Sequence, residues 1–342
     1  MNTNLHFYNH PGPFKLESGV VLNNLHIVYH TYGRLNEAKN NVIWICHALT
    51  ANSDVADWWP GMVGDGKPFD PTTHFIVCAN ILGSCYGTVA DGLFPENELP
   101  VLITIRDMVH AHIILRKHLA IENIELLVGG SMGGYQTIEW CVTEPAVIEK
   151  QFLLVTGAAE SAWGIAIHTA QRLAIEADAT WLKNTGGAKG LKAARAFGMI
   201  TYRSYKQYVI SQTDDAEKTD GFKASSYINY QGEKLVSRFN AKSYWSLTRS
   251  MDSHNIARGR GGNIGEVLAL VVQPTLIVGI NSDFLCPTQE QQVLASYLPH
   301  SRLHIIDSLY GHDGFLTETA KVSGILRDWM KGKNYEGCRL KA

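Results

Sequence analysis

The sequence predicts an α/β fold, with a mostly parallel sheet, helices on both faces and a helical insertion. Near-continuous apolar runs such as NVIWIC from Asn41 and TLIVGI from Thr275 are typical of parallel strands buried on both faces. Segments with a helical pattern follow several of these runs, which is the alternation expected of an α/β sheet. Residues 160–262 differ, because they contain many helix formers with aromatic residues and few strand-like runs.

The sequence pattern of the first part of the chain predicts strands. Residues 19–33 (GVVLNNLHIVYHTYG) alternate apolar and polar side chains and indicate strands with a turn at Asn23–Asn24. The apolar runs that start at Asn41 and His74 indicate two more strands, and the first of them leads into a polar loop.

The middle of the chain predicts a helix and then a strand–turn–helix unit. Apolar residues recur at a 3.6-residue period over residues 104–119, and Thr104 is a plausible N-cap. Residues 124–128 predict a buried strand and residues 135–142 the start of a helix. QFLLVTGAA, residues 151–159, predicts a further strand.

The strand pattern resumes after Pro274, so the core is discontinuous in sequence. We expect a core of residues 1–159 and 264–342 and a helical lid insertion of residues 160–263. The segment ARGRGGN, residues 257–263, is the expected return linker. TLIVGI and, further on, LHIIDS supply the last strands of the sheet.

Composition excludes several classes of protein. The 342 residues include 30 basic and 32 acidic side chains, so charge gives no reason to expect nucleic acid or an anionic membrane as a partner. No apolar run approaches the ~20 residues that span a bilayer, and the N-terminus does not read as a signal peptide. The cysteines show no CxxC spacing, and Cys46, Cys78 and Cys141 are expected as buried free thiols. We therefore expect a soluble, cytoplasmic protein without a metal site.

The segment VGGSMGGYQTIEW, residues 128–140, contains a candidate nucleophile. Gly129-Gly130-Ser131-Met132-Gly133 matches G-x-S-x-G between a strand and a helix, the pattern of a nucleophile elbow. Such a turn lifts the serine hydroxyl above the sheet and points the first helix amides toward it. A plain structural turn is the alternative interpretation.

A serine nucleophile needs a base and an orienting carboxylate, and in this architecture they follow in the order Ser, Asp, His. Asp283 follows the strand TLIVGI, and His312 follows the strand LHIIDS. Each residue alone could be a turn or loop residue. Because both lie at carboxyl ends of strands, as Ser131 does, we predict a catalytic triad of Ser131, Asp283 and His312.

The oxyanion hole needs two backbone amides. The helix after the elbow supplies that of Met132, and the loop CHALTANSD, which follows the strand 42–45, supplies that of Leu49. His47 in this loop is expected to shape it and not to take part in catalysis.

Several longer motifs resemble the homoserine O-acetyltransferase family, whose members are α/β-hydrolase-fold enzymes of methionine biosynthesis. The resemblance runs from about Pro13 to Glu318 and rests on the elbow together with HALTANSDVADWWPGMVGDGKPFD, ITIRDMV, ITYRS, YQGEKLVSRF, MDSHNIARGRGG and YGHDGF. General esterases do not share several of these motifs.

The resemblance implies a ping-pong transfer of an acetyl group from acetyl-CoA, through Ser131, to the hydroxyl of L-homoserine. It also implies that Arg203 holds the substrate carboxylate and Asp313 its amino group, a pairing consistent with the chemistry of the two side chains. Acetyl-CoA is a co-substrate, and no cofactor is expected. Family members are usually homodimers that meet through the insertion, and exposed aromatic residues there would suit that contact.

One loop departs from the family pattern, and alternatives to the acetyl transfer remain. After GSCYG, relatives usually carry Ser/Thr-Gly-Pro and a longer loop near the active site, whereas here Val89 and Ala90 follow Thr88. A succinyl donor or a serine acceptor would use the same scaffold. An esterase would use the same triad with water as acceptor, and a non-catalytic scaffold would predict a broken triad.

Overall fold

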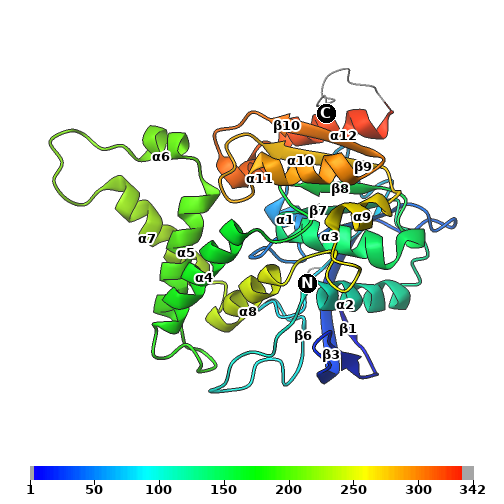
Figure 1. Ribbon diagram of the computed structural model, residues 1–342, viewed down its shortest axis with the longest axis horizontal. Coiled ribbons are helices and arrows are strands. Elements are labelled where there is room, and N and C mark those ends of the chain that lie inside the picture. Colours follow the sequence, from blue (N-terminus) through cyan, green and yellow to red (C-terminus); the bar gives the residue numbers. More distant parts are fainter. Residues whose placement is uncertain (1–3, 333–342) are drawn as a thin grey trace.

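The computed structural model describes residues 4–332, which form a twisted sheet with helices on both sides and a group of helices at one end (Figure 1). The strand order is β1-β3-β5-β4-β7-β8-β9-β10. From β5 to β10 all neighbours run parallel, whereas β1 and β5 pair antiparallel with β3. The predicted mostly parallel α/β sheet is therefore confirmed.

The strands are short except for one. They are β1 (Leu5–Asn9), β2 (Phe14–Lys15), β3 (Val21–Tyr32), β4 (Val42–Cys46), β5 (Phe75–Ala79), β6 (Val89–Asp91), β7 (Leu126–Gly130), β8 (Gln151–Leu154), β9 (Thr275–Ile280) and β10 (Ser301–Ile306). The helices of the core are α1 (Val55–Trp58), α2 (Ile105–His118), α3 (Met132–Thr143), α9 (Ile264–Ala269), α10 (Thr288–Tyr297), α11 (Gly314–Thr317) and α12 (Thr319–Met330), with short 3-10 turns η1 (Pro145–Val147) and η2 (Gly311–Asp313).

Both faces of the central strands are buried, as their continuous apolar runs predict. On β4, Trp44 packs into the cluster under α2 and α3, whereas its neighbours Ile43 and Ile45 point into the opposite cluster. That second cluster includes Val322 and Leu326 of α12. The alternation of side chains along each strand thus supplies two hydrophobic cores, one on each face of the sheet.

Helix α2 begins where its sequence predicts. The Thr104 hydroxyl accepts a hydrogen bond from the backbone N–H of Asp107, and the Asp107 carboxylate accepts one from the Thr104 backbone N–H. This reciprocal capping box satisfies two amides that have no acceptor inside the helix.

Two predicted boundaries were wrong. Residues 21–32 form one strand, β3, and the asparagine pair makes no turn. Instead the register shifts between Asn23 and His26, where Asn24 adopts a φ of 52°, so the chain bulges while it pairs with β6. The predicted strand 151–159 ends at Leu154, because Val155 has a φ of 43° and leaves the sheet.

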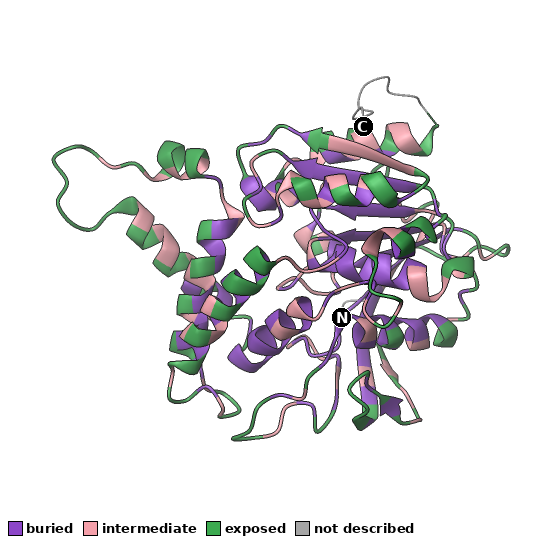
Figure 2. Ribbon diagram, in the orientation of Figure 1, coloured by how far each residue is buried: buried purple, intermediate pink, exposed green. Residues whose placement is uncertain are grey.

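Residues 160–263 form a helical segment and, within this described range, contain no strand. Its helices are α4 (Ala162–Glu176), α5 (Ala188–Tyr202), α6 (Tyr205–Gln212), α7 (Lys223–Val236) and α8 (Ala241–Asp252). Figure 1 shows α4 to α7 extending away from the sheet, and Figure 2 shows that much of their outer surface is exposed. Helix α8 is largely buried, and its Tyr244 and Leu247 belong to the same apolar cluster as α2 and α3.

None of the helices within residues 4–332 combines the length and apolar character needed to cross a membrane. Cys46, Cys78 and Cys141 are buried free thiols, as predicted.

Candidate active site

Ser131 lies at the turn between β7 and α3, with φ 53° and ψ −126°. This backbone conformation is costly for a residue with a side chain, and such strain is common at functional sites. The sequence around it permits the turn, because a Cβ on Gly133 would lie 2.0 Å from the carbonyl oxygen of Cys46. The tight packing of α3 against the end of β4 therefore requires glycine at this position of the elbow.

His312 and Asp283 meet beyond the ends of β10 and β9. The Nδ1–H of His312 donates to Oδ2 of Asp283 at 2.7 Å, and both side chains are buried. The other oxygen, Oδ1, accepts the backbone N–H groups of Leu285 and Cys286, each at 2.9 Å. The two backbone N–H groups and the His312 ring together hold the Asp283 carboxylate in one orientation. This orientation fixes the proton of His312 on Nδ1.

This pairing changes the acidity of His312. Burial lowers the pKa of the imidazole, but the nearby carboxylates outweigh it, first the charge and hydrogen bond of Asp283 and then Asp313 and Glu160, so the pKa lies above its ordinary value. Nε2 is buried without a hydrogen-bond partner among residues 4–332, so it can accept a proton. His312 and Ser131 line the same two cavities. The structure thus places the three predicted residues at one edge of the sheet.

The loop after β4 lies against the elbow. The side-chain Nε2–H of Gln136, on α3, donates to the His47 carbonyl oxygen at 3.4 Å. His47 Nε2 accepts the backbone N–H of Ile81 at 3.1 Å, and its Nδ1–H donates to the carbonyl oxygen of Ala48 at 2.9 Å. Burial lowers the pKa of His47 to about 4, so the ring is neutral. His47 therefore shapes the loop, as expected.

The predicted oxyanion donors lie on the two elements that meet here. Met132 is the first residue of α3, so its N–H has no acceptor within the helix. Leu49 lies in the loop held by His47 and lines both cavities beside Ser131.

A residue of the helical segment 160–263 that sequence reasoning missed holds this loop from the other side. Arg238, just after α7, donates from Nη1 to the carbonyl oxygen of Thr50 at 2.5 Å and to the hydroxyl of Tyr86 at 2.7 Å. Its signal in the sequence is the arginine of YQGEKLVSRF, but nothing in that motif indicates a contact with residue 50.

The outer cavity has a volume of about 340 Å³ and reaches from Ser131 to the insertion. Arg203 and Asp313 both line it, and Arg203 Nε lies 3.1 Å from Asp313 Oδ2. The Nε–H does not point at this oxygen, so the contact is an ion pair without a hydrogen bond. Burial raises the pKa of Asp313 more than the neighbouring Arg203 lowers it.

The insertion is fastened to the histidine loop at this point. A Cβ on Gly311, whose φ is 62°, would lie 2.8 Å from the Tyr202 carbonyl oxygen and 2.9 Å from the Ser204 nitrogen. The Ser204 hydroxyl donates to the Leu309 carbonyl oxygen at 2.5 Å. This close approach of two backbones explains how Arg203, far from Asp313 in sequence, comes to lie beside it.

The loop after Gly87, which departs from the family pattern in the sequence analysis, does not line either cavity. Thr88 is buried and its Oγ1 accepts the backbone N–H of Val28 at 3.0 Å, and β6 pairs with β3. Within this part of the described chain only Tyr86 lines the outer cavity.

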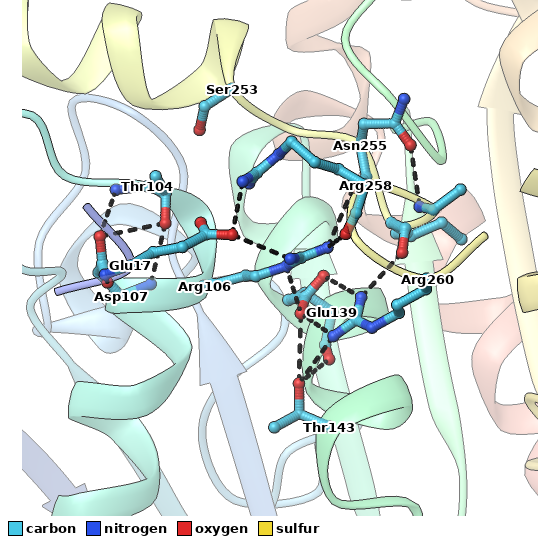
Figure 3. A network of polar contacts seen from close by, with 12 residues as sticks. Glu17, Thr104, Arg106, Asp107, Glu139, Thr143, Ser253, Asn255, Arg258 and Arg260 are labelled. Atoms are coloured by element: carbon cyan, nitrogen blue, oxygen red, sulfur yellow. Dashed lines mark hydrogen bonds and ion pairs between the residues drawn. The ribbon is translucent and has the colours of Figure 1, made fainter. Parts of the chain in front are cut away.

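A polar network centred on the buried Glu139 holds the elbow helix and the return linker together (Figure 3). Glu139 of α3, whose side chain is 2% exposed, pairs with Arg106 Nε at 3.2 Å and accepts from Arg260 Nη1 at 2.9 Å. Glu17 pairs with both Arg106 and Arg258, at 2.9 and 2.5 Å. Charge pairs of this kind cross-link the N-terminal segment, α2, α3 and the linker of the insertion.

The sheet is mostly parallel and carries a serine at a strand–helix elbow. An aspartate and a histidine in hydrogen-bond contact follow that serine in sequence. Together these features define an α/β-hydrolase-fold protein. The family model described as alpha/beta hydrolase fold matches residues 41–319. The homoserine O-acetyltransferase of Chlorobium luteolum is 43% identical to this chain, over 96% of this chain and 95% of its own length. The chain therefore belongs to the homoserine O-acetyltransferase family.

Solved structures agree with this assignment. The homoserine O-acetyltransferase of Staphylococcus aureus matches with a TM-score of 0.82 and 28% identity, over 97% of each chain. Esterase E22 matches with a TM-score of 0.85 and 20% identity, over 95% of this chain and 99% of its own. At this lower identity the esterase demonstrates the shared fold alone.

Proposed function

We propose that the protein transfers the acetyl group of acetyl-CoA to the hydroxyl of L-homoserine, through an acetyl ester on Ser131. The observation that carries this proposal is that Ser131 and His312, the latter hydrogen-bonded to Asp283, line one cavity together with Arg203 and Asp313. The triad supplies the nucleophile, base and acid, and the reaction needs acetyl-CoA as a co-substrate but no resident cofactor or metal.

In the first half-reaction Nε2 of His312 takes the proton of the Ser131 hydroxyl while Oγ attacks the thioester carbonyl carbon. The amides of Met132 and Leu49 receive the negative charge that forms on the carbonyl oxygen. The C–S bond then breaks, and the leaving CoA sulfur takes the proton from His312. Ser131 is left as an acetyl ester.

The second half-reaction reverses these steps with a new nucleophile. His312 removes the proton of the homoserine hydroxyl, whose oxygen attacks the acetyl ester, and the proton returns to Oγ of Ser131 as the ester bond breaks. Arg203 holds the carboxylate of homoserine, since a guanidinium can donate two parallel hydrogen bonds to it. Asp313 receives the ammonium group, and the resting ion pair keeps both charges in the cavity.

Thiol release from acetyl-CoA, with and without L-homoserine, tests the transfer. We expect a burst of one thiol per active site without acceptor and continuous release, with O-acetylhomoserine as product, when homoserine is present. Rapid continuous release that is indifferent to homoserine would identify a hydrolase instead. L-serine in place of homoserine, and succinyl-CoA in place of acetyl-CoA, test the remaining alternatives.

We propose that two copies of the chain meet through the insertion and that the enzyme serves methionine biosynthesis in the cytoplasm. Large apolar side chains are exposed on α5 to α7, including Ile200 at 58%, Tyr205 at 85%, Ile210 at 63% and Tyr230 at 58%. Exposed apolar patches of this kind mark interaction surfaces. Light scattering of the full chain should give the mass of a dimer, and Tyr205→Glu together with Ile210→Glu should give a monomer.

A further inference from the structure

A second, smaller cavity meets Ser131 from the inside. The outer and inner cavities share four lining residues, so they meet at the candidate nucleophile: Leu49, Ser131, Tyr202 and His312. The outer cavity has a volume of about 340 Å³, and the inner about 30 Å³. Of these two cavities, Arg203 and Asp313 line the outer one and not the inner one.

Acyl transfer needs two separate spaces at the serine. The CoA thiol and the amino-acid acceptor must each reach His312 and then leave to solvent, whereas the acyl group stays on Ser131 between the two half-reactions. The outer cavity contains the charge pair that suits the acceptor. The remaining space for the acyl group is the inner cavity.

We propose that the inner cavity is the acyl chamber and that lid side chains Ile167 and Met251 limit the acyl group to the size of acetyl. This inference rests on the proposed transfer and names the residues that select its donor. Ile167 lies on α4 and Met251 on α8, and they are 8% and 5% exposed. Val155 and Leu285 line the chamber from the core.

The volume of the chamber decides which acyl group fits. A volume of about 30 Å³ holds two to three groups of the size of a water molecule, since one requires about 10–15 Å³. Acetyl places only a methyl group beyond its carbonyl carbon, and propionyl adds one methylene. Butyryl adds a second methylene, and succinyl carries a whole carboxymethyl group beyond its first methylene. The chamber therefore favours acetyl, is filled by the longer apolar groups and is too small for succinyl.

The charge of the chamber also opposes a succinyl group. Its lining contains no lysine or arginine among the described residues, and it does contain Glu160. Glu160 is 7% exposed in its side chain and accepts a hydrogen bond from the Tyr135 hydroxyl at 3.1 Å. The nearby His168 is already bound to Asp252 at 2.8 Å. The carboxylate of a succinyl group in this chamber would lose its water and would find no lysine or arginine of the lining to pair with. It would also lie close to the Glu160 carboxyl group, so its burial would cost free energy.

The polar groups of the wall explain why a small apolar group can still enter. Glu160 pairs with Tyr135, and His168 pairs with Asp252, so these side chains satisfy one another without the ligand. The amide oxygen Oε1 of Gln171 is buried without a partner among residues 4–332.

Rapid-quench mass spectrometry of the acyl-enzyme tests the proposal. The full chain is mixed without acceptor with acetyl-, propionyl-, butyryl- or succinyl-CoA, and the rate of covalent acylation is measured. We expect acetyl to react fastest, butyryl to react at least about tenfold more slowly, and succinyl to give no adduct, since one methylene is worth about 10- to 200-fold in a fitted pocket.

Enlarged chambers should change the preference for chain length. Met251→Ala and Ile167→Ala should each raise the ratio of butyryl to acetyl acylation by about tenfold or more. Leu173→Ala is the matched control, because Leu173 lies on the same helix as Ile167 but is 60% exposed. Ile167→Val removes a single methyl group and keeps the packing, and it should raise the ratio of propionyl to acetyl.

The outcomes separate this inference from the function on which it rests. Equal acylation of the native chain by acetyl-, butyryl- and succinyl-CoA would overturn the acyl chamber. The acyl chamber would also be overturned if the enlarged variants, Ile167→Val included, still formed an acetyl-enzyme but kept the native ratios of longer-chain to acetyl acylation. The proposed function fails in another way, if the native chain forms no acetyl-enzyme or if homoserine does not remove the acetyl group.

Discussion

Replacing Asp283 by asparagine preserves the shape of the side chain but reverses its hydrogen bond to His312. Oδ1 of Asp283 accepts two backbone N–H groups at 2.9 Å, so the carbonyl oxygen of asparagine must remain there. Its NH₂ group then faces Nδ1 of His312, where Oδ2 accepts at 2.7 Å in the native chain. Nδ1 becomes an acceptor, and the proton moves to Nε2, the atom that must take the proton of Ser131.

The size of the loss follows from the same geometry. Two unit charges about 4 Å apart interact by about 4 kcal/mol at the effective dielectric of a protein, and that energy corresponds to roughly a thousandfold in rate. This is the stabilisation of the His312 cation that Asp283→Asn removes, and the wrong tautomer adds to it. The analogous change in serine triads costs about ten-thousandfold. We expect acylation to slow by about a thousandfold to ten-thousandfold.

Stopped-flow thiol release on mixing with acetyl-CoA measures this rate. Asp307→Asn is a matched control, because Asp307 follows the same strand as His312 but is exposed, and its acylation rate should stay native. If Asp283→Asn kept more than about a tenth of the native rate, Asp283 would not orient the base, and the predicted triad would be wrong.

Four further predictions follow from other contacts. Arg203→Ala should raise the homoserine KM by about tenfold or more, the value of a charged hydrogen bond, and leave that of acetyl-CoA unchanged; an unchanged homoserine KM would remove Arg203 from the carboxylate role. Glu139→Ala should lower the free energy of unfolding by about 1.5–3 kcal/mol, since Arg260 loses its carboxylate partner and Arg106 keeps only Glu17, and denaturant titration giving under ~1 kcal/mol would contradict this. The kcat/KM for acetyl-CoA should fall as the pH drops through a midpoint above the ordinary histidine value of about 6.5, because His312 must be neutral and its pKa is raised; a midpoint well below that value would refute the assignment. Arg238→Ala should slow acylation by p-nitrophenyl acetate as well as by acetyl-CoA, by about 10- to 100-fold, because it releases the Thr50 carbonyl; a loss confined to acetyl-CoA would make it a ligand of CoA.

The sequence predicted the parts of the fold and site that depend on local pattern. Continuous apolar strands and the glycine-flanked Ser131 are visible in a single stretch of chain, and the carboxyl ends of parallel strands meet at one edge. Asp283 and His312 could therefore be placed near Ser131 without any knowledge of packing. Arg203 and Asp313 were found through family resemblance, because no local pattern distinguishes them from surface residues.

The features that sequence reasoning missed depend on tertiary contacts. The asparagine pair at 23–24 is typical of a turn, but here a bulge and the pairing with β6 keep β3 continuous. Contacts from the insertion are still harder to predict, since the position of a helix over the sheet is set by packing. Arg238 reaches Thr50 across the cavity, and Ile167 and Met251 form one wall of the inner chamber.

The most direct test of the account is the fate of the acetyl group on the peptide that contains Ser131. Mixing the protein with acetyl-CoA alone should add one acetyl group there, and L-homoserine should then remove it with formation of O-acetylhomoserine. Ser131→Ala should carry no acetyl group under the same conditions. Transfer through this serine would be contradicted if the Ser131→Ala variant still acetylated homoserine. It would also be contradicted if water hydrolysed the acetyl-enzyme as fast as homoserine deacetylates it.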